Sequence, residues 1–428
     1  MATKLYVEAS EIMAAVAMTL SKEKLKSYES RDGLVKFLID GKKIANSNKI
    51  LYGKPADKKE FLKAFDPSEK QFLDEAAKGI SAAYSIKEWL VEINDRGVNI
   101  KKPIADRVFM TGDTWPTEVQ KFQVEAFGFK SYNSSDIIFR VEKGYYGVSL
   151  KKKAKETAPD PTIINKAFDS VLQGNEFNKI KNDIKSVRAK YFSKVIREAF
   201  KKGPLKLVGK LPTSDEELFS LSIKDIVKGG KRAIIDLKGY GVVNLNDQNK
   251  SSKTLFPTDI TKDVKLSMRE FVNRKLGSND SVFSELIKVL NKYSEIFANS
   301  LLNLVLKTNL YKELEDNSFA FALITAVAKL DKDDSPQIQV SQAKPLHTVL
   351  CGLSALNKGR KKYEIKLDKE KNKNLDAAKV YLLLSKGNVN VLDMELRYKG
   401  SFTPQPQFFA TISKDFSKII NEQCIVPA

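Results

Sequence analysis

Asp136, Ser149 and Lys151 are the residues whose types and spacing best fit a chemical site. They fall in two strand-like runs, DIIFRV (136–141) and YYGVSLK (145–151), separated by a short turn that contains a glycine. Side chains alternate along a strand, so Ser149 and Lys151 are expected on one face. Leu150 would then face the other way, with its carbonyl free to line the site, and pairing of the two strands would bring Asp136 beside it.

This combination suits metal-dependent cleavage of a phosphodiester. A hard cation such as Mg2+ binds carboxylate, carbonyl and water oxygens. It polarises the phosphate and lowers the pKa of a bound water, while a nearby lysine orients that water or stabilises the developing charge. The pattern therefore predicts hydrolysis of a nucleic-acid backbone.

The pattern resembles that of the PD-(D/E)xK, or restriction-endonuclease-like, nucleases, in which an Asp at one strand is followed by an acidic-x-Lys triplet on the next. Here the matching residues are Ser135-Asp136 and Ser149-Leu150-Lys151. The chain departs from the pattern twice, with Ser135 in place of proline and Ser149 in place of the second carboxylate. Some type II restriction enzymes look similar, with SDI followed by G(V/I)S(L/I)K, and take a carboxylate from the preceding helix.

The resemblance implies a set of roles. Asp136 and the Leu150 carbonyl would bind Mg2+ (or Mn2+), Lys151 would position the attacking water, and Ser149 would hydrogen-bond within the site. A short helix is predicted over residues 118–127, and two of its glutamates, seven residues apart, share one face. Glu118 is the first choice for the missing carboxylate, and Glu125 is the second.

Charge indicates a polyanionic partner. The 428 residues include 73 Lys+Arg against 53 Asp+Glu, a net charge of +20. Residues 151–210 hold 16 basic against 6 acidic residues, and four of the basic ones recur every three or four positions on a predicted helix. We expect double-stranded DNA as the partner, with a homodimer as an open alternative. The residues expected to contact DNA are Lys152, Lys153, Lys190, Lys194, Arg197, Lys201, Arg397 and Lys399.

The scarce residue types exclude several classes of site. One histidine cannot supply a His-rich metal cluster, and Cys351 and Cys424 lack the spacing of a zinc site. The apolar run at 12–20 is too short to span a bilayer and lacks the basic start of a secretory signal. We expect a soluble, cytoplasmic protein with reduced cysteines, or a virion-associated one if the chain is phage-encoded.

The predicted fold is mixed α/β, with a restriction-endonuclease-like central sheet and large helical elaborations. Apolar periodicity predicts a long amphipathic helix at 282–306, while FAFALITAVAKL (319–330), apolar all round, is predicted to be a buried helix. Two strands are predicted within 232–245. The expected regions are a helical 1–105, a nuclease core motif at 106–160, a basic and mainly helical 161–335, and C-terminal strands at 336–428 that complete the core.

Other interpretations stay open. A basic nucleic-acid-binding protein without catalysis, such as a nucleoprotein or an inactive nuclease fold used in assembly or recognition, fits the same charge and length. Asp236-Leu237-Lys238 is a rival acidic-x-Lys triplet. The choice between DNA and RNA, the sequence specificity and the oligomeric state do not follow from the sequence.

Overall fold

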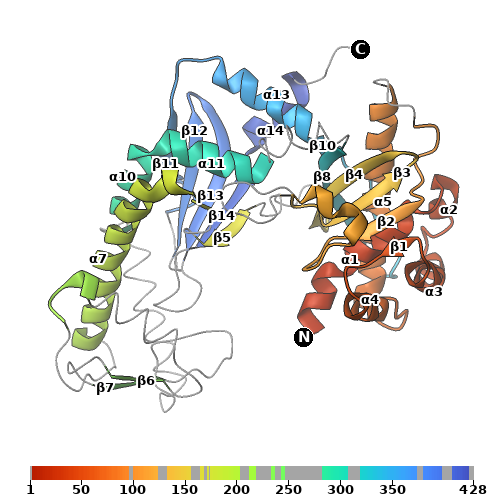
Figure 1. Ribbon diagram of the computed structural model, residues 1–428, viewed down its shortest axis with the longest axis horizontal. Helices are drawn as coiled ribbons and strands as arrows, with labels where there is room; N and C mark the ends of the chain where they lie inside the picture. The colour runs from red at the N-terminus through yellow and green to blue at the C-terminus, as the bar shows by residue number, and fades with distance from the viewer. Residues whose placement is uncertain are drawn as a thin grey trace. The chain divides into compact units, whose positions relative to one another are not determined.

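The computed structural model divides the chain into two compact units. Unit 1 comprises residues Met1–Pro161, Leu306–Lys358 and Ile419–Ala428, and unit 2 comprises Thr162–Val305 and Gly359–Lys418. The structure describes residues 2–95, 100–123, 133–155, 164–167, 171–172, 174–202, 212–217, 233–236, 242–245, 282–306, 319–373, 379–397 and 407–423. Each unit has its own sheet, labelled in Figure 1. The predicted mixed α/β class is confirmed.

Unit 1 is built on a seven-stranded mixed sheet in the order β1-β2-β3-β4-β8-β10, with β9 also paired to β8. Strands β2, β3 and β4 form an antiparallel meander, whereas β1 runs parallel to β2 and β8 runs parallel to β4. The strands are β1 (Ile50–Leu51), β2 (Arg107–Met110), β3 (Ile137–Val141), β4 (Gly144–Lys153), β8 (Phe319–Leu330), β9 (Pro336–Gln339) and β10 (Lys344–Pro345).

Two long helices of unit 1 pack on each other and on this sheet. They are α1 (Ala2–Met18) and α5 (Lys70–Asp95), and every residue from 12 to 18 of α1 is fully buried. Such burial explains why this stretch is apolar without being a membrane segment. The remaining helical elements are α2 (Lys22–Lys26), α3 (Arg31–Asn46), α4 (Pro55–Phe61), α13 (Leu346–Asn357) and the 3-10 turns η1 (Leu62–Ala64) and η2 (Thr117–Phe122).

Helices α1 and α5 run parallel and approach most closely at Gly79. A β-carbon at Gly79 would lie 2.4 Å from Cβ of Met13 and 2.8 Å from the nitrogen of Ala14, so only glycine fits there. Further along, Lys87 Nζ donates to the carbonyl of Met18, the last residue of α1, at 3.4 Å. The N-terminal halves of the two helices therefore lie side by side as well.

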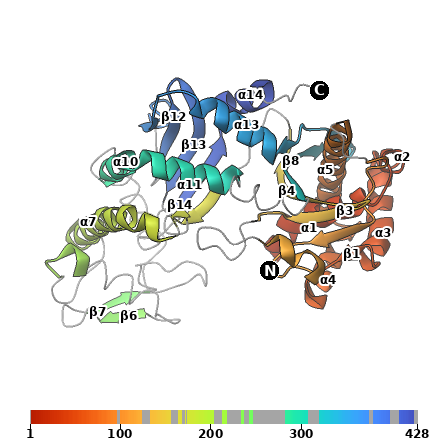
Figure 2. The ribbon, with the colours of Figure 1, turned by 45° about the horizontal axis from the view of Figure 1, so that its top comes forward.

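Unit 2 contains a five-stranded antiparallel sheet in the order β11-β12-β13-β14-β5. Phe297 of α11 packs on Phe408 of β14 with ring centroids 5.2 Å apart, and Figures 1 and 2 both show α11 crossing the strands. The sheet strands are β5 (Ile164–Ala167), β11 (Tyr363–Leu367), β12 (Lys379–Lys386), β13 (Val389–Arg397) and β14 (Gln407–Ile412). The other elements are η3 (Asn175–Phe177), α7 (Asn178–Lys202), the two-stranded sheet β6 (Ala233–Asp236) and β7 (Val242–Leu245), α10 (Val282–Lys292), α11 (Ser294–Leu306) and α14 (Lys414–Gln423).

One edge of this five-stranded sheet is closed by helix side chains. Asn291 of α10 both accepts from the main-chain N–H of Ile365 (2.8 Å) and donates to its carbonyl (3.0 Å). Glu295 of α11 accepts from the N–H of Tyr363 at 2.9 Å. These side chains therefore occupy the outward positions of β11, where a further strand would pair.

Several sequence predictions need correction. Residues 319–330 form strand β8, not a buried helix, and the helix predicted at 282–306 is interrupted at Tyr293. The helix predicted at 118–127 is described only as the 3-10 turn Thr117–Phe122. The C-terminal strands of 363–412 do not complete the central sheet, because they form the separate sheet of unit 2. The two strands predicted within 232–245 are confirmed, as a sheet of their own.

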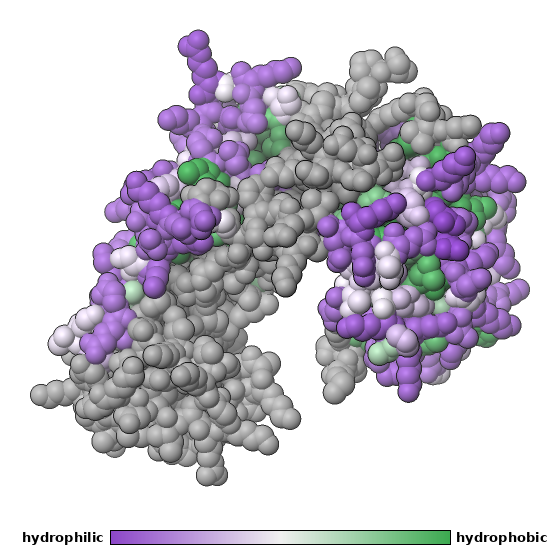
Figure 3. Space-filling model, viewed as in Figure 1, coloured by the Kyte–Doolittle hydropathy of each residue, from purple (hydrophilic) through white to green (hydrophobic). Residues whose placement is uncertain are grey.

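The described surface is mostly polar. In Figure 3 the hydrophobic residues of unit 1 appear as small separate spots among hydrophilic ones. The large apolar side chains that are exposed, namely Ile39, Val91, Ile296 and Val340, are scattered over different elements. Within the described ranges, none of the helices combines the length and the apolar composition needed to cross a bilayer.

Candidate active site

Asp136 is held by the main chains of three strands. It directly precedes β3, its N–H donates to the carbonyl of Val148 at 2.8 Å, and its carbonyl accepts from the N–H of Thr111 at 3.3 Å. Its carboxylate accepts two hydrogen bonds on one oxygen, Oδ2, from the N–H of Leu150 (2.6 Å) and from the hydroxyl of Ser149 (3.3 Å). The predicted trio of Asp136, Ser149 and Leu150 is therefore brought together.

A local turn delivers the chain to this position. Asn133 Oδ1 accepts from both the N–H and the hydroxyl of Ser135, at 2.9 and 2.6 Å. Its amide group donates to the carbonyl of Phe122 at 3.1 Å. A β-carbon at Gly147 would lie 2.3 Å from the Ser135 hydroxyl, so a glycine in β4 is needed for this close approach. The SerSerAsp segment is thus positioned by residues on both sides of it.

Lys151 supplies a positive charge at this end of the sheet. Burial raises the pKa of the Asp136 carboxyl above its usual value, and the opposing influences are, in order, the charge of Lys151, the Leu150 N–H and the Ser149 hydroxyl. Lys151 is partly exposed and lies on the same face of β4 as Ser149. The lysine of the predicted motif is therefore close enough to act on the Asp136 carboxylate.

Glu11 of α1 is the second carboxylate near Asp136. The pKa of Glu11 is raised well above its usual range, first by burial, next by the negative charge of Asp136 and then by that of Glu8. The charges of Lys152 and Lys151 act in the opposite direction. Two carboxylates that raise each other's cost of ionisation in this way are a common arrangement for binding a cation or sharing a proton.

The sequence analysis missed Glu11 although a signal was present. Glu8 and Glu11 stand directly before the apolar run of α1, on a helix whose neighbouring residues 9, 10 and 12–18 are buried. An acidic side chain at the edge of a buried stretch is unusual unless it has a role or a partner. Only the fold brings α1 to β3, more than 120 positions later in the chain.

Glu118, the carboxylate preferred from the sequence, lies elsewhere. It accepts hydrogen bonds from Arg107 (2.7 Å), Arg140 (3.2 Å) and the Tyr145 hydroxyl (2.8 Å). Arg140 and Tyr145 face each other next to the β3–β4 turn, whereas Asp136 is at the opposite end of β3. The structure therefore does not bring Glu118 to Asp136, and Glu125 lies outside the described residues.

The predicted DNA-contacting residues fall into several groups. Lys152 forms an ion pair with Glu75 of α5 at 2.8 Å, while Lys153 is partly exposed. In unit 2, Lys190 and Arg197 of α7 lie 3.8 and 3.6 Å from the acidic Glu285 and Asp215. The side chains of Lys194, Lys201 and Arg397, and all of Lys399, lie outside the described part of the structure. The rival Asp236 lies on β6, and the Leu237 and Lys238 that follow it are also outside.

The donor set fits a Mg2+ ion that keeps several waters. Among the described residues, no three His, Cys, Asp or Glu side chains form a group that could hold a metal unaided. Mg2+ often binds through only one or two carboxylates together with waters and substrate phosphates. Asp136 and Glu11 would supply those carboxylates. The Leu150 main chain contacts Asp136 through its N–H, and its carbonyl as a ligand stays a prediction.

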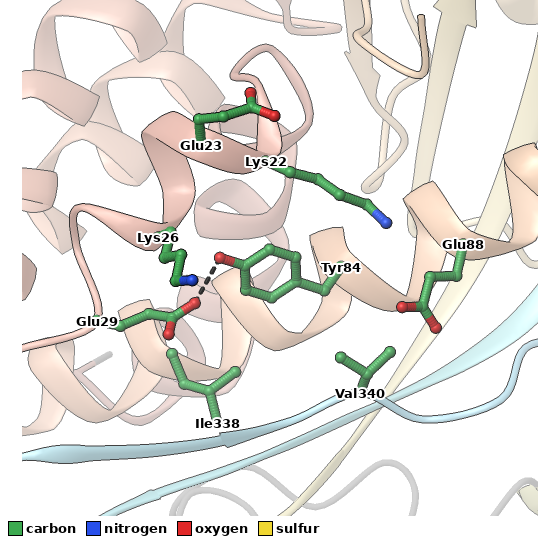
Figure 4. A pocket seen from close by; sticks show the side chains of 8 residues that line it. All are labelled: Lys22, Glu23, Lys26, Glu29, Tyr84, Glu88, Ile338 and Val340. Carbon is green, nitrogen blue, oxygen red and sulfur yellow. Dashed lines mark hydrogen bonds between the residues drawn. The ribbon is translucent and has the colours of Figure 1, made fainter.

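A pocket of about 580 Å3 lies at another part of unit 1 (Figure 4). There the Tyr84 hydroxyl donates to Glu29, and the lining residues are Lys22, Glu23, Lys26, Glu29, Tyr84, Glu88, Ile338 and Val340. None of these residues belongs to the Asp136 site. Comparison with family models, curated proteins and solved structures finds no match to the chain.

Proposed function

We propose that the protein is a metal-dependent endonuclease that hydrolyses phosphodiester bonds of DNA, with its site in unit 1. The observation that carries this proposal is the meeting of Asp136 and Glu11, two carboxylates with raised pKa values, beside Lys151. Asp136 and Lys151 stand on the neighbouring strand pair that the restriction-endonuclease-like resemblance calls for. A carboxylate from helix α1 would take the part that Ser149 cannot.

Each residue has a chemical task in this proposal. A bound Mg2+ or Mn2+ supplies a Lewis acid for the phosphate and lowers the pKa of a water. Asp136 and Glu11 hold the cation through their oxygens, and the Leu150 N–H and the Ser149 hydroxyl keep the Asp136 carboxylate in place. Lys151 orients the attacking water or stabilises the negative charge that develops on the phosphate.

The proposed substrate is DNA, held largely by charge. The excess of basic residues, 73 against 53, supports a polyanionic partner. Because Lys190 and Arg197 have acidic neighbours, their net contribution to phosphate binding should be smaller than a count of cations suggests. Affinity should fall steeply with salt, as expected when bound counterions are released from DNA.

Plasmid cleavage tests the proposal directly. Supercoiled DNA is incubated with the full chain in Mg2+, Mn2+ or EDTA, beside Asp136→Asn, Glu11→Gln and Lys151→Ala. Nicking that requires the metal and is lost in all three variants supports the assignment. Glu118→Gln is the matched control, and it should cleave like the wild type because its carboxylate lies among Arg107, Arg140 and Tyr145.

Binding without cleavage would reverse the conclusion. A gel shift of DNA by the wild type, unchanged in the Asp136, Glu11 and Lys151 variants and insensitive to metal, would favour the non-catalytic nucleic-acid-binding alternative. Cleavage of RNA but not of DNA by the same residues would keep the site and change the substrate.

A further inference from the structure

A chain of buried ion pairs lies next to the proposed metal site. Glu75 of α5 accepts from Lys152 Nζ at 2.8 Å on one oxygen and from Lys78 Nζ at 3.0 Å on the other. Lys78 also binds Asp74 at 2.6 Å. The Glu75 side chain is only 5% exposed, whereas that of Asp74 is 31% exposed. Glu75 is thus an internal anion shared by two lysines.

The packing of α1 on α5 places this chain near Glu11. The two helices run parallel and touch where Gly79 meets Met13 and Ala14. One turn before Gly79 is Glu75, and one turn before Ala14 is the Ser10–Glu11 pair. Lys152 reaches from β4 to Glu75, and its positive charge is among those that lower the pKa of Glu11. Lys152 therefore lies between an anion that binds it and a second anion close by.

We propose that Glu75 is a positioning residue that retains the Lys152 ammonium on α5, so that the lysine does not pair with Glu11 and compete with the divalent cation. This inference rests on the proposed metal site at Asp136 and Glu11. An ammonium and a metal ion would compete for the same carboxylate oxygens, because both are cations that neutralise them. The proposal gives Lys152 an internal role in place of the DNA contact expected from the sequence.

The inference predicts an unusual pattern among variants. Glu75→Gln frees Lys152 to approach Glu11, so Mn2+ should bind roughly 10-fold more weakly, the effect typical of removing a residue behind a ligand. Adding Lys152→Met to Glu75→Gln removes the competitor, so the double variant should regain affinity to within about 2-fold of the wild type. A purely structural role for Glu75 predicts the opposite, since the double variant has lost more contacts.

The matched control is Asp74→Asn. Asp74 shares Lys78 with Glu75, whereas the carboxylate that pairs with Lys152 is that of Glu75. The Mn2+ affinity of Asp74→Asn should stay within about 2-fold of the wild type. Lys152→Met alone covers the case in which Glu75→Gln does not fold, because it should bind Mn2+ at least as tightly as the wild type.

The experiment measures Mn2+ dissociation constants of the full chain by electron paramagnetic resonance of the free ion, with plasmid cleavage in parallel. Unchanged affinity in Glu75→Gln, no recovery in the double variant, or a 10-fold loss in Lys152→Met would each overturn the inference. A wild type that does not bind Mn2+ would overturn it as well. Mn2+ binding with the predicted pattern but without cleavage would sink the nuclease proposal and leave this inference supported.

Discussion

The main-chain N–H of Leu150 donates a 2.6 Å hydrogen bond to Oδ2 of Asp136, from the strand that follows the aspartate's own. The position of the carboxylate is therefore fixed by the pairing of β3 with β4, together with the Asp136 N–H bond to Val148. A hydrogen bond from a main-chain N–H favours the charged form of a carboxylate, and here it opposes the effect of burial. The site is thus organised by the backbone before any ligand binds.

Asp136→Asn should abolish cleavage while leaving the fold intact. The asparagine oxygen can still accept from Leu150, but the negative charge needed for the cation is lost. We expect the cleavage rate to fall by at least ~100-fold, beyond the usual effect of a residue behind a ligand. The melting temperature without metal should stay the same or rise, because the buried charge is removed. Rate and circular dichroism melts measure the two effects.

Ser149→Ala is the companion variant on the same oxygen. It removes only the 3.3 Å hydroxyl bond, so its rate should fall by less than ~10-fold, in keeping with about 1 kcal/mol for such a bond. Equal losses in the two variants would mean that the charge of Asp136 is not what the reaction needs.

Stability should depend on pH through Glu11. Its pKa is raised in the folded chain above the ordinary value of 4.5, so between these two values the folded state holds the extra proton. This proton makes the folded state more favourable as the pH falls through the raised pKa, and the gain is complete below the ordinary value. Without metal, Glu11→Gln should be more stable than the wild type at about pH 8, and the difference should shrink towards about pH 5.

Urea unfolding of both proteins across this range measures the difference. The neutral glutamine cannot titrate, so a difference that stays constant with pH would show that Glu11 ionises as in the unfolded chain. Mn2+ should stabilise the wild type more at the higher pH, because protons and the cation compete for the same oxygens.

Gly79→Ala should destabilise unit 1 and weaken the site together. The added β-carbon would meet Met13 at 2.4 Å and the main chain of Ala14 at 2.8 Å. Separating α1 from α5 costs about 1–3 kcal/mol by the usual effect of overpacking, and it moves the helix that carries Glu11. Gly112→Ala is the control, since no atom lies within 4 Å of the place that its β-carbon would take, and its stability should be unchanged. Urea midpoints compare the two variants.

Lys87 should give the opposite dependence on pH. Burial lowers the pKa of this fully buried lysine to about 7, and its ammonium donates to the carbonyl of Pro103 at 2.6 Å. Between about 7 and the ordinary 10.5 the unfolded chain holds the extra proton, so stability due to Lys87 rises with pH in that window. The slope approaches about 1.4 kcal/mol per pH unit. Lys87→Met should lack it, and urea unfolding at about pH 7 and about pH 9 measures the difference. A Lys87→Met protein with the wild-type slope would show that another group is responsible.

The hairpin around Asp136 was predictable because its signals are local. Alternating apolar residues and a turn of Glu142-Lys143-Gly144 determine both strands, and Glu142 takes the positive φ of 54° that such a tight turn needs. Strand β8 was not predictable from its pattern. It is apolar on both faces because β4 and β10 flank it and helices cover it, and a strand buried on both sides has no alternation to read.

The site itself was half predictable. Asp136, Ser149 and Lys151 are close in sequence, so strand pairing alone brings them together. Glu11 is not, since its approach depends on how α1 packs against α5 and the sheet, which no short spacing encodes. Glu118 was a reasonable choice by distance along the chain, but Arg107 and Arg140 provide it with stronger partners.

The way Asn291 and Glu295 close the edge of β11 has a consequence for how copies of the chain meet. An open strand edge is a template on which identical molecules can polymerise. Here the amide of Asn291 imitates the missing neighbour, supplying one donor and one acceptor to Ile365. At this edge the sheet is finished within a single molecule, which protects a highly concentrated solution of the protein against fibre growth from that side.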